Sequence, residues 1–216
     1  SYEMFNNCAK LTHITMDRVN LSKCTTTSST FNKCNAITHI SMKNANLSST
    51  KDITFVAKNT IVDVNLSGAD LSGVTTLKET FKGKTALTTV DLSDITISNC
   101  YDLTSMFDGC KKLQTVNMKN FKTTYNGENY VKLKSMFQNC SSLTSFSFEG
   151  WDFTNVGDIS YMFRYCTSLK SFTWEFKFTD RFLYATGVFT GCTSLESVDI
   201  SNSDFGACTK ISETFQ

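Results

Sequence analysis

A phenylalanine recurs along this chain at a nearly constant interval, and this rhythm limits the possible folds more than any other feature. Successive members of the series are separated by 26, 24, 26, 26, 30, 26, 26 and 26 residues. A fixed period of this length is typical of repeat proteins, in which each unit is one coil that packs on the next. The series consists of Phe5, Phe31, Phe55, Phe81, Phe107, Phe137, Phe163, Phe189 and Phe215.

Each Phe is followed by apolar residues at fixed distances. In all eight units an apolar residue lies six, nine and eleven positions later, as Leu143, Phe146 and Phe148 do after Phe137. This Leu-x-x-Leu-x-Leu spacing is the strand signature of a leucine-rich repeat, and its last two residues alternate so that both point inward. A second apolar group, about nineteen and twenty-two residues after the Phe, has the spacing of a short helix or 3-10 turn.

The pattern predicts an α/β repeat. We expect a leucine-rich-repeat solenoid of about eight coils, with short parallel strands on one face and short helical or 3-10 segments on the other. Residues 1–216 form a single array in this interpretation, and because both ends fall within a repeat we expect an excerpt of a longer array without its caps. The structural core is predicted to include Phe107, Cys110, Leu113, Phe137, Cys140, Leu143, Phe163, Cys166, Leu169, Phe189, Cys192 and Leu195.

The segment from Ser135 to Ser145 carries a more specific signature. It reads Met-Phe-x-x-Cys-x-x-Leu, and the signature returns 26 residues later around Phe163. This text resembles the BspA-like leucine-rich repeats of bacterial and protist surface proteins. The resemblance covers the whole chain, most closely from Tyr101 onward, and it implies surface display, adhesion and protein binding without catalytic residues.

Composition excludes several classes of function. The 21 basic and 20 acidic residues nearly balance, which argues against a nucleic-acid partner. No apolar run approaches the roughly 18 residues that would span a membrane. No Ser-His-Asp order, phosphate loop or glycosidase-like pair of carboxylates is present. We therefore predict a protein that is not an enzyme and needs no cofactor.

The nine cysteines allow three interpretations. Six of them lie three residues after their Phe, in an inward-facing column. A buried thiol behaves as a small hydrophobic group. Stacked positions such as Cys140 and Cys166 are also near enough for a disulfide between coils. A zinc site is disfavoured because no Cys-x-x-Cys pair occurs.

Candidate binding residues fall in three places. The register puts His13, His39 and Asp63 in one file on the exposed strand face, as a divalent-metal site, a pH-sensitive patch or simply a solvated row, and we assign no metal ligand. The aromatic residues beyond the repeat pattern form either an exposed patch or a thicker core. A four-residue insertion with an Asn-Gly pair predicts a protruding loop. The aromatic residues are Trp151, Phe176 and Phe178, and the residue in the inserted loop is Tyr125.

The sequence predicts a non-catalytic binding or adhesion module, extracellular or on a cell surface. Its polar strand face would recognise a protein or glycan on another cell. The alternative is a structural subunit or spacer of an extracellular fibre, appendage or viral particle, in which neighbouring subunits, including copies in a homo-polymer, are the partners.

Overall fold

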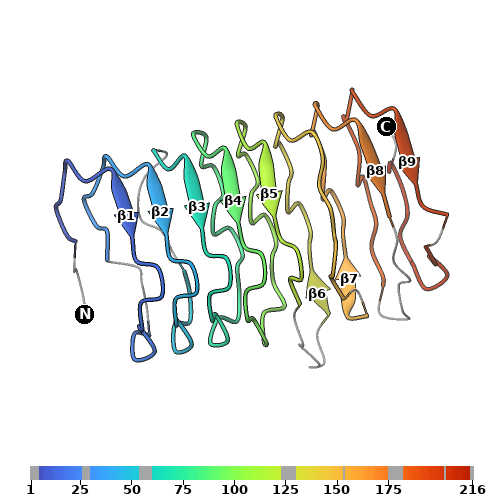
Figure 1. Ribbon diagram of the computed structural model, residues 1–216. Coiled ribbons are helices and arrows are strands. Elements are labelled where there is room, and N and C mark those ends of the chain that lie inside the picture. Colours follow the sequence, from blue (N-terminus) through green and yellow to red (C-terminus); the bar gives the residue numbers. More distant parts are fainter. Residues whose placement is uncertain are drawn as a thin grey trace.

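The structure is a computed structural model, which describes residues 5–25, 30–53, 60–122, 130–152, 154–174, 182–201 and 203–214. Its coils follow one another along a single axis (Figure 1). Short strands are the regular elements of the described residues. They are β1 (His13–Thr15), β2 (His39–Ser41), β3 (Asp63–Asn65), β4 (Thr89–Asp91), β5 (Thr115–Asn117), β6 (Val131–Lys132), β7 (Val156–Asp158), β8 (Ser171–Thr173) and β9 (Ser197–Asp199).

Strand pairing runs from each coil to the next. Strands β1 to β5 form one parallel sheet in sequence order, and β8 pairs with β9 on the same side of the molecule. The middle residues pair directly, as Ile14 does with Ile40 and Val64 does with Val90. Parallel pairing between consecutive coils defines a β-solenoid, as the repeat predicts. The number of eight coils stays a prediction.

The opposite side of the molecule, here called the return side, differs from the prediction. Hydrogen-bonded turns, the pair β6–β7 and the bridges in line with it, from Thr76 to Lys132 and from Asp158 to Lys210, occur there. No helix is found among the described residues. The reason lies in the backbone: Ser105, Ser135 and Tyr161 have φ of 54°, 55° and 59°. A residue in this left-handed region interrupts a right-handed helix. The prediction of short helical or 3-10 segments was wrong for these residues.

Alternate residues on the return side bond to the next coil. The amide of Ser105 donates to the carbonyl of Lys134 at 2.9 Å, and the amide of Phe107 donates to that of Met136 at 2.8 Å. The residue between them, Met106, donates within its own turn to Leu103, at 3.2 Å. The same alternation continues through the later coils, so this backbone forms a second ladder between coils, here called the return-side ladder.

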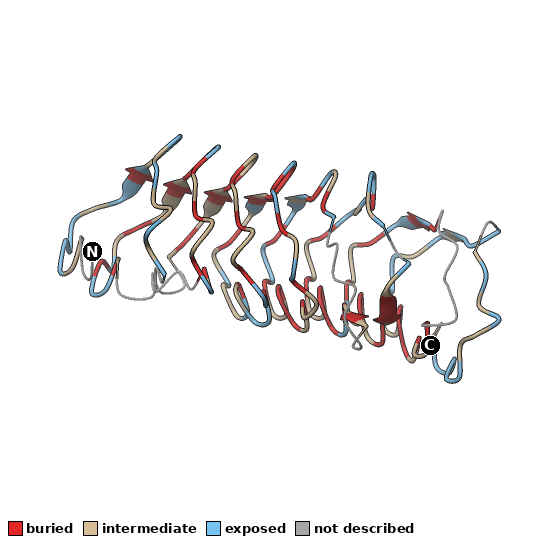
Figure 2. Cartoon of the chain, turned by 90° about the horizontal axis from the view of Figure 1, so that it is seen from below, coloured by how far each residue is buried: buried red, intermediate tan, exposed pale blue. Residues whose placement is uncertain are grey.

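The Phe column is the centre of the core. Successive rings stack nearly parallel, with centroids 5.2 Å apart for Phe81 and Phe107 and 5.3 Å apart for Phe107 and Phe137. The four-residue insertion lies between Phe107 and Phe137, and it does not change this spacing. The predicted core residues from Phe107 to Leu169 are fully buried, whereas Phe189 is 5% exposed and Cys192 and Leu195 are half-buried. Buried residues line the inner side of the coils (Figure 2).

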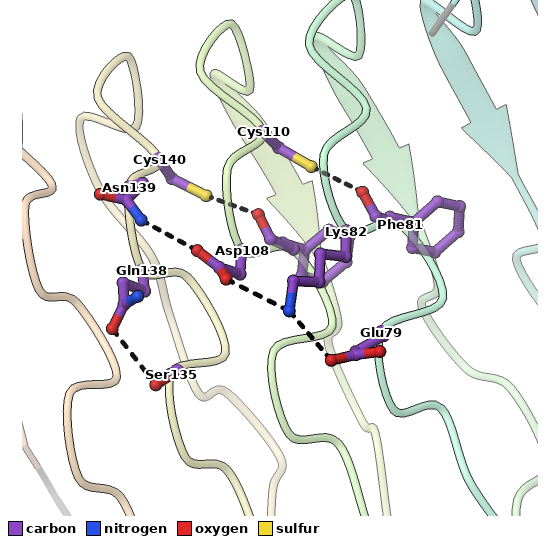
Figure 3. Close-up of polar contacts among 10 residues, drawn as sticks. Glu79, Phe81, Lys82, Asp108, Cys110, Ser135, Gln138, Asn139 and Cys140 are labelled. Carbon is purple, nitrogen blue, oxygen red and sulfur yellow. Dashed lines mark hydrogen bonds and ion pairs between the residues drawn. The ribbon is translucent and has the colours of Figure 1, made fainter. Parts of the chain in front are cut away.

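The cysteine column is bonded to the Phe column. Figure 3 shows the thiols of Cys110 and Cys140 donating to the carbonyls of Phe81 and Phe107, at 2.9 and 3.1 Å. Each carbonyl also accepts the amide three residues later in its own coil, so both lone pairs are used. Cys is small and carries a donor, which suits this position in six units, whereas Lys84 holds it after Phe81.

A polar chain runs outside these columns. Lys82 Nζ lies 2.9 Å from Glu79 and 3.8 Å from Asp108, and the Asn139 amide donates to Asp108 at 3.0 Å (Figure 3). These contacts join three consecutive coils. Exposed pairs of this kind contribute little each, about 0–1 kcal/mol.

Candidate binding surface

The strand face presents two outward-facing files of polar side chains. The strands β1 to β4 and β8 bury their middle residue and leave its two neighbours exposed or half-buried, as the eBe pattern of β1 and β8 shows. Because each strand residue pairs with the equivalent residue of the next strand, the residues of one file lie next to each other on successive coils. The first file contains His13, His39, Asp63, Thr89, Thr115, Ser171 and Ser197, and the second contains Thr15, Ser41, Asn65, Asp91, Asn117, Thr173 and Asp199.

The structure brings the His-His-Asp file together. The rings of His13 and His39 stack with centroids 4.1 Å apart and planes 4° apart. The Nε2 atom of His39 lies 3.0 Å from Asp63 Oδ2, and its Nδ1 lies 2.6 Å from the Thr38 hydroxyl. Both ring nitrogens of His39 are therefore engaged. Within the described residues, no group of three His, Cys, Asp or Glu side chains is placed to hold a metal ion.

Much of the second file is satisfied within the chain. The Asp91 carboxylate accepts hydrogen bonds from the Ser93 amide at 3.0 Å and from its hydroxyl at 2.7 Å. Asp199 does the same with Ser201, and these hydrogen bonds lower the pKa of Asp199. Such side chains close the turns after the strands. They are less available for a partner than their exposure suggests.

The strand ladder stops at Ser145–Ser147. This segment holds the place of a strand between β5 and β8 but is not one, and the described residues show no backbone hydrogen bond from it to either neighbour. The flanks are still joined: Lys170 donates to Thr144 at 3.4 Å and Asn120 to Glu149 at 2.9 Å. Three consecutive residues thus make no backbone hydrogen bond to the neighbouring coils.

Large aromatic rings lie under this break. Phe146 occupies the inward position that Val116 has in the preceding coil, and it packs 4.6 Å from Phe137 and 4.8 Å from Phe148, measured between ring centroids. Extra volume in a packed core displaces the backbone around it. Phe172 holds the same inward position in the next coil and still pairs in β8, so ring size alone does not interrupt the ladder. We attribute the interruption to the crowding of Phe146 against Phe137 and Phe148.

A depression of about 440 Å³ lies at the same place. Exposed hydroxyl groups form its rim, and the half-buried Phe146 with the buried Phe148 and Phe172 forms its floor. The repeat pattern did not predict this site, although Phe146 and Phe172 on consecutive coils, in a column otherwise made of Ile and Val, are the signal that marks it. Its lining is Ser145, Phe146, Ser147, Phe148, Glu149, Gly150, Ser171, Phe172 and Thr173.

The other predicted binding residues are not gathered here. Trp151 is half-buried, stacks on Phe121 at 4.8 Å and donates its indole N–H to the Met118 carbonyl at 2.8 Å. It belongs to the thicker core rather than to an exposed patch. Tyr125, Phe176 and Phe178 lie outside the described residues.

The buried thiols are not suited to nucleophilic chemistry. Burial raises the pKa of Cys110 to about 12 and that of Cys192 to about 11, and it raises the pKa of Cys140 and Cys166 well above the ordinary value. The thiolate is the reactive form of cysteine. All nine cysteines, which lie within the described residues, are thiols and not disulfides.

The fold and this surface define the class of the protein as a parallel β-solenoid built from coils of the leucine-rich-repeat type. The chain belongs to the family DUF285, described as a Mycoplasma protein of unknown function, whose model matches residues 1–121, 54–174 and 131–216. No curated protein matches the sequence. No helix among the described residues is long and apolar enough to cross a membrane.

Three solved structures illustrate what the chain is similar to. A leucine-rich-repeat protein of T. pallidum is 19% identical over 70% of this chain and 72% of its own, with a TM-score of 0.42. A leucine-rich cell surface protein of Faecalibacterium prausnitzii is 14% identical over 97% and 65%, with a TM-score of 0.46. A leucine-rich-repeat protein of Bacteroides ovatus is 18% identical over 96% and 68%, with a TM-score of 0.37. These likenesses are loose.

Proposed function

We propose that this chain is a non-catalytic binding module that recognises a protein or glycan through its strand face. The observation that carries the proposal is the depression at Ser145–Ser147, where the strand ladder is open. Main-chain groups that lack a hydrogen-bond partner within the sheet are able to bond to an extended peptide or a polar ligand. Aromatic floors with a few polar groups on the rim are typical of ligand sites.

The charges around the depression favour a neutral, polar partner. Its rim consists of the hydroxyls of Ser145, Ser147, Ser171 and Thr173, and its carboxylate, Glu149, lies 2.7 Å from Lys119. Hydroxyls both donate and accept, so they match the hydroxyls of a sugar or the amides of a peptide. No histidine lines the depression to activate these hydroxyls, which supports binding rather than catalysis.

The location at a cell surface is part of the same proposal. It rests on the resemblance to BspA-like repeats, whose finer subtype stays a prediction for this chain. Labelling of intact cells with an antibody against the chain tests it: labelling without permeabilisation supports the location, and labelling only after permeabilisation contradicts it.

The binding proposal is tested by blocking the depression. We expect Ser171→Tyr to abolish binding of the chain to a glycan array and to a panel of extracellular-matrix proteins. Thr89→Tyr is the matched control, because Thr89 holds the same outward position on β4, away from the depression. Equal binding by the two variants and the unchanged chain would contradict a site at the depression. Binding by none, together with ordered polymers in electron micrographs, would favour the structural alternative.

A further inference from the structure

Two tyrosines on the return side each lie over a glycine of the next coil. A Cβ atom added at Gly187 would lie 2.8 Å from the ring of Tyr161, and one added at Gly191 would lie 2.4 Å from the ring of Tyr165. The backbones are joined at the same places, since Tyr161 and Tyr165 donate to the carbonyls of Thr186 and Thr190, both at 2.8 Å. The glycines therefore make room for the two rings.

Both tyrosines have a backbone conformation that bulky side chains rarely adopt. Their φ angles are 59° and 61°, and no other aromatic residue of the described chain has a left-handed φ. Equivalent positions in other coils carry small or polar residues. Backbone strain at a surface cluster is a reason to look for a function there. The first position holds Glu79, Ser105, Ser135, Gly187 and Glu213, and the second holds Asn7, Lys33, Gly83, Gly109, Asn139 and Gly191.

Arg164 lies between the two rings. Its guanidinium carbon is 5.3 Å from the ring centroid of Tyr161 and 4.8 Å from that of Tyr165, and Nη2 donates to the Tyr165 hydroxyl at 3.2 Å. The Nε atom is enclosed without a hydrogen-bond partner, and the ion pairs of the described residues do not include this side chain. A guanidinium has five N–H donors, so most of them are not used within the described chain.

We propose that Tyr161, Arg164 and Tyr165 bind a carboxylate side chain on an acidic peptide segment of a partner protein. The planar guanidinium matches a carboxylate, which it can hold with two parallel hydrogen bonds. The two rings beside it hold the guanidinium in place in advance, and tyrosine and arginine are enriched among the residues that contribute most to binding at protein interfaces. One cation balances one carboxylate, whereas a doubly charged phosphate would keep an uncompensated negative charge. Tyr165, which is 43% exposed, supplies apolar contact area beside the charge.

This site is independent of the strand-face depression. It is built from turns of the return side around Phe163, whereas the depression is built from residues on either side of the broken strand ladder. Loss of one therefore does not predict loss of the other.

The test is a titration of the chain followed by the NMR signal of the Arg164 Nε–H group. The probe is an acetylated peptide with a single Glu flanked by Gly and Tyr, and the comparison peptide carries Gln instead. We expect a saturable shift with the Glu peptide and about tenfold weaker binding of the Gln peptide, because a charge-assisted bond is lost. Tighter binding of inorganic phosphate or of sialyllactose than of the Glu peptide would overturn the proposal, as would equal binding of the two peptides.

Three variants distinguish a loss of binding from a loss of stability. Calorimetry measures the peptide binding of each variant. Arg164→Gln should abolish the preference for Glu, while Lys112→Gln, which removes the same charge from an exposed position in another coil, should retain it. Tyr165→Asn should weaken binding without lowering the melting temperature, since Asn139 holds this position in the preceding coil with φ of 60°. Undiminished binding by both Arg164→Gln and Tyr165→Asn would overturn the proposal. A Tyr165→Asn variant that binds normally but melts earlier would show that the ring is structural.

Discussion

The two ladders of this solenoid respond differently to the same irregular coil. The return-side ladder runs without interruption from Leu77 to Thr214, across the place where four residues are inserted. The strand-side ladder stops at Ser145–Ser147, directly after the insertion. The return-side ladder therefore holds the coils in register, and the irregular coil loses its backbone pairing on the strand face instead.

Chemistry explains the difference. On the return side three kinds of contact repeat in every coil from Phe107 to Phe189: a stacked ring, a thiol bonded to a carbonyl and an alternating backbone ladder. On the strand side β1 to β5, β8 and β9 have only three paired residues each, and the crowded rings around Phe146 are enough to interrupt the pairing. Backbone groups without a hydrogen bond to the next coil occur on the strand face, and this is the face to which we assign ligand binding in our proposal.

The largest effect is expected from the Phe column. Phe137→Ala should lower the free energy of unfolding by about 3–5 kcal/mol, because it removes a fully buried ring and leaves a cavity between two stacked neighbours. Equilibrium denaturation in urea measures it. A loss no greater than that of Phe146→Val would contradict the view that the Phe side holds the register.

The thiol column gives the next effect. Cys140→Ala should cost about 1–2 kcal/mol, from lost burial and from a Phe107 carbonyl with one hydrogen bond fewer. The control is Cys8→Ala, since Cys8 is exposed and should be nearly neutral to stability.

Alkylation of the cysteines is a second test of whether the thiol column is buried. At pH 8 iodoacetamide should modify Cys8 while Cys110, Cys140 and Cys166 stay protected, because burial keeps the folded thiols protonated well above that pH. Mass spectrometry of the labelled chain reads this directly, and rapid labelling of Cys140 in the folded chain would show that the column is open.

A smaller effect is expected from repairing the strand side. Phe146→Val places the residue of the preceding coil under the break, so strand pairing at Ser145–Ser147 should form and the depression should shrink. Stability should change by less than about 1 kcal/mol, since a lost aromatic contact is offset by new backbone hydrogen bonds. Slower amide exchange at Ser147 is the expected readout, and unchanged exchange would exclude the ring as the cause of the break.

The smallest effect is expected from acid. Asp17 accepts a hydrogen bond from Ser41 at 2.6 Å and another from the Lys43 amide at 2.9 Å, and the first of these lowers its pKa below 3.8. A lowered folded pKa stabilises the fold above the unfolded value, and this contribution is lost as the pH falls through the folded pKa. Asp17→Asn should therefore slightly flatten the decline in melting temperature below about pH 4. A parallel decline in both chains would exclude the effect.

Some of this could be predicted from sequence. The columns at fixed distances from each Phe predicted the solenoid and its strand register, and the register alone placed His13, His39 and Asp63 side by side. The return side could not be predicted, because left-handed residues such as Ser105 and Ser135 have no obligatory residue type and apolar spacing alone resembles a helix. The prediction of Trp151 as a binding residue fails because the repeat pattern does not show that its coil has an enlarged core. The depression depends on backbone that fails to pair, which no residue count reveals.

Hydrogen exchange followed amide by amide on the unchanged chain tests the central claim most directly. The amides of Phe107, Ser135 and Phe137, which donate to the next coil, should exchange slowly, while those of Phe146 and Ser147 should exchange at least about a hundredfold faster. That result would show one continuous and one interrupted ladder within the same coils. Equal protection on the two sides, or faster exchange at Phe107 and Phe137, would contradict the account.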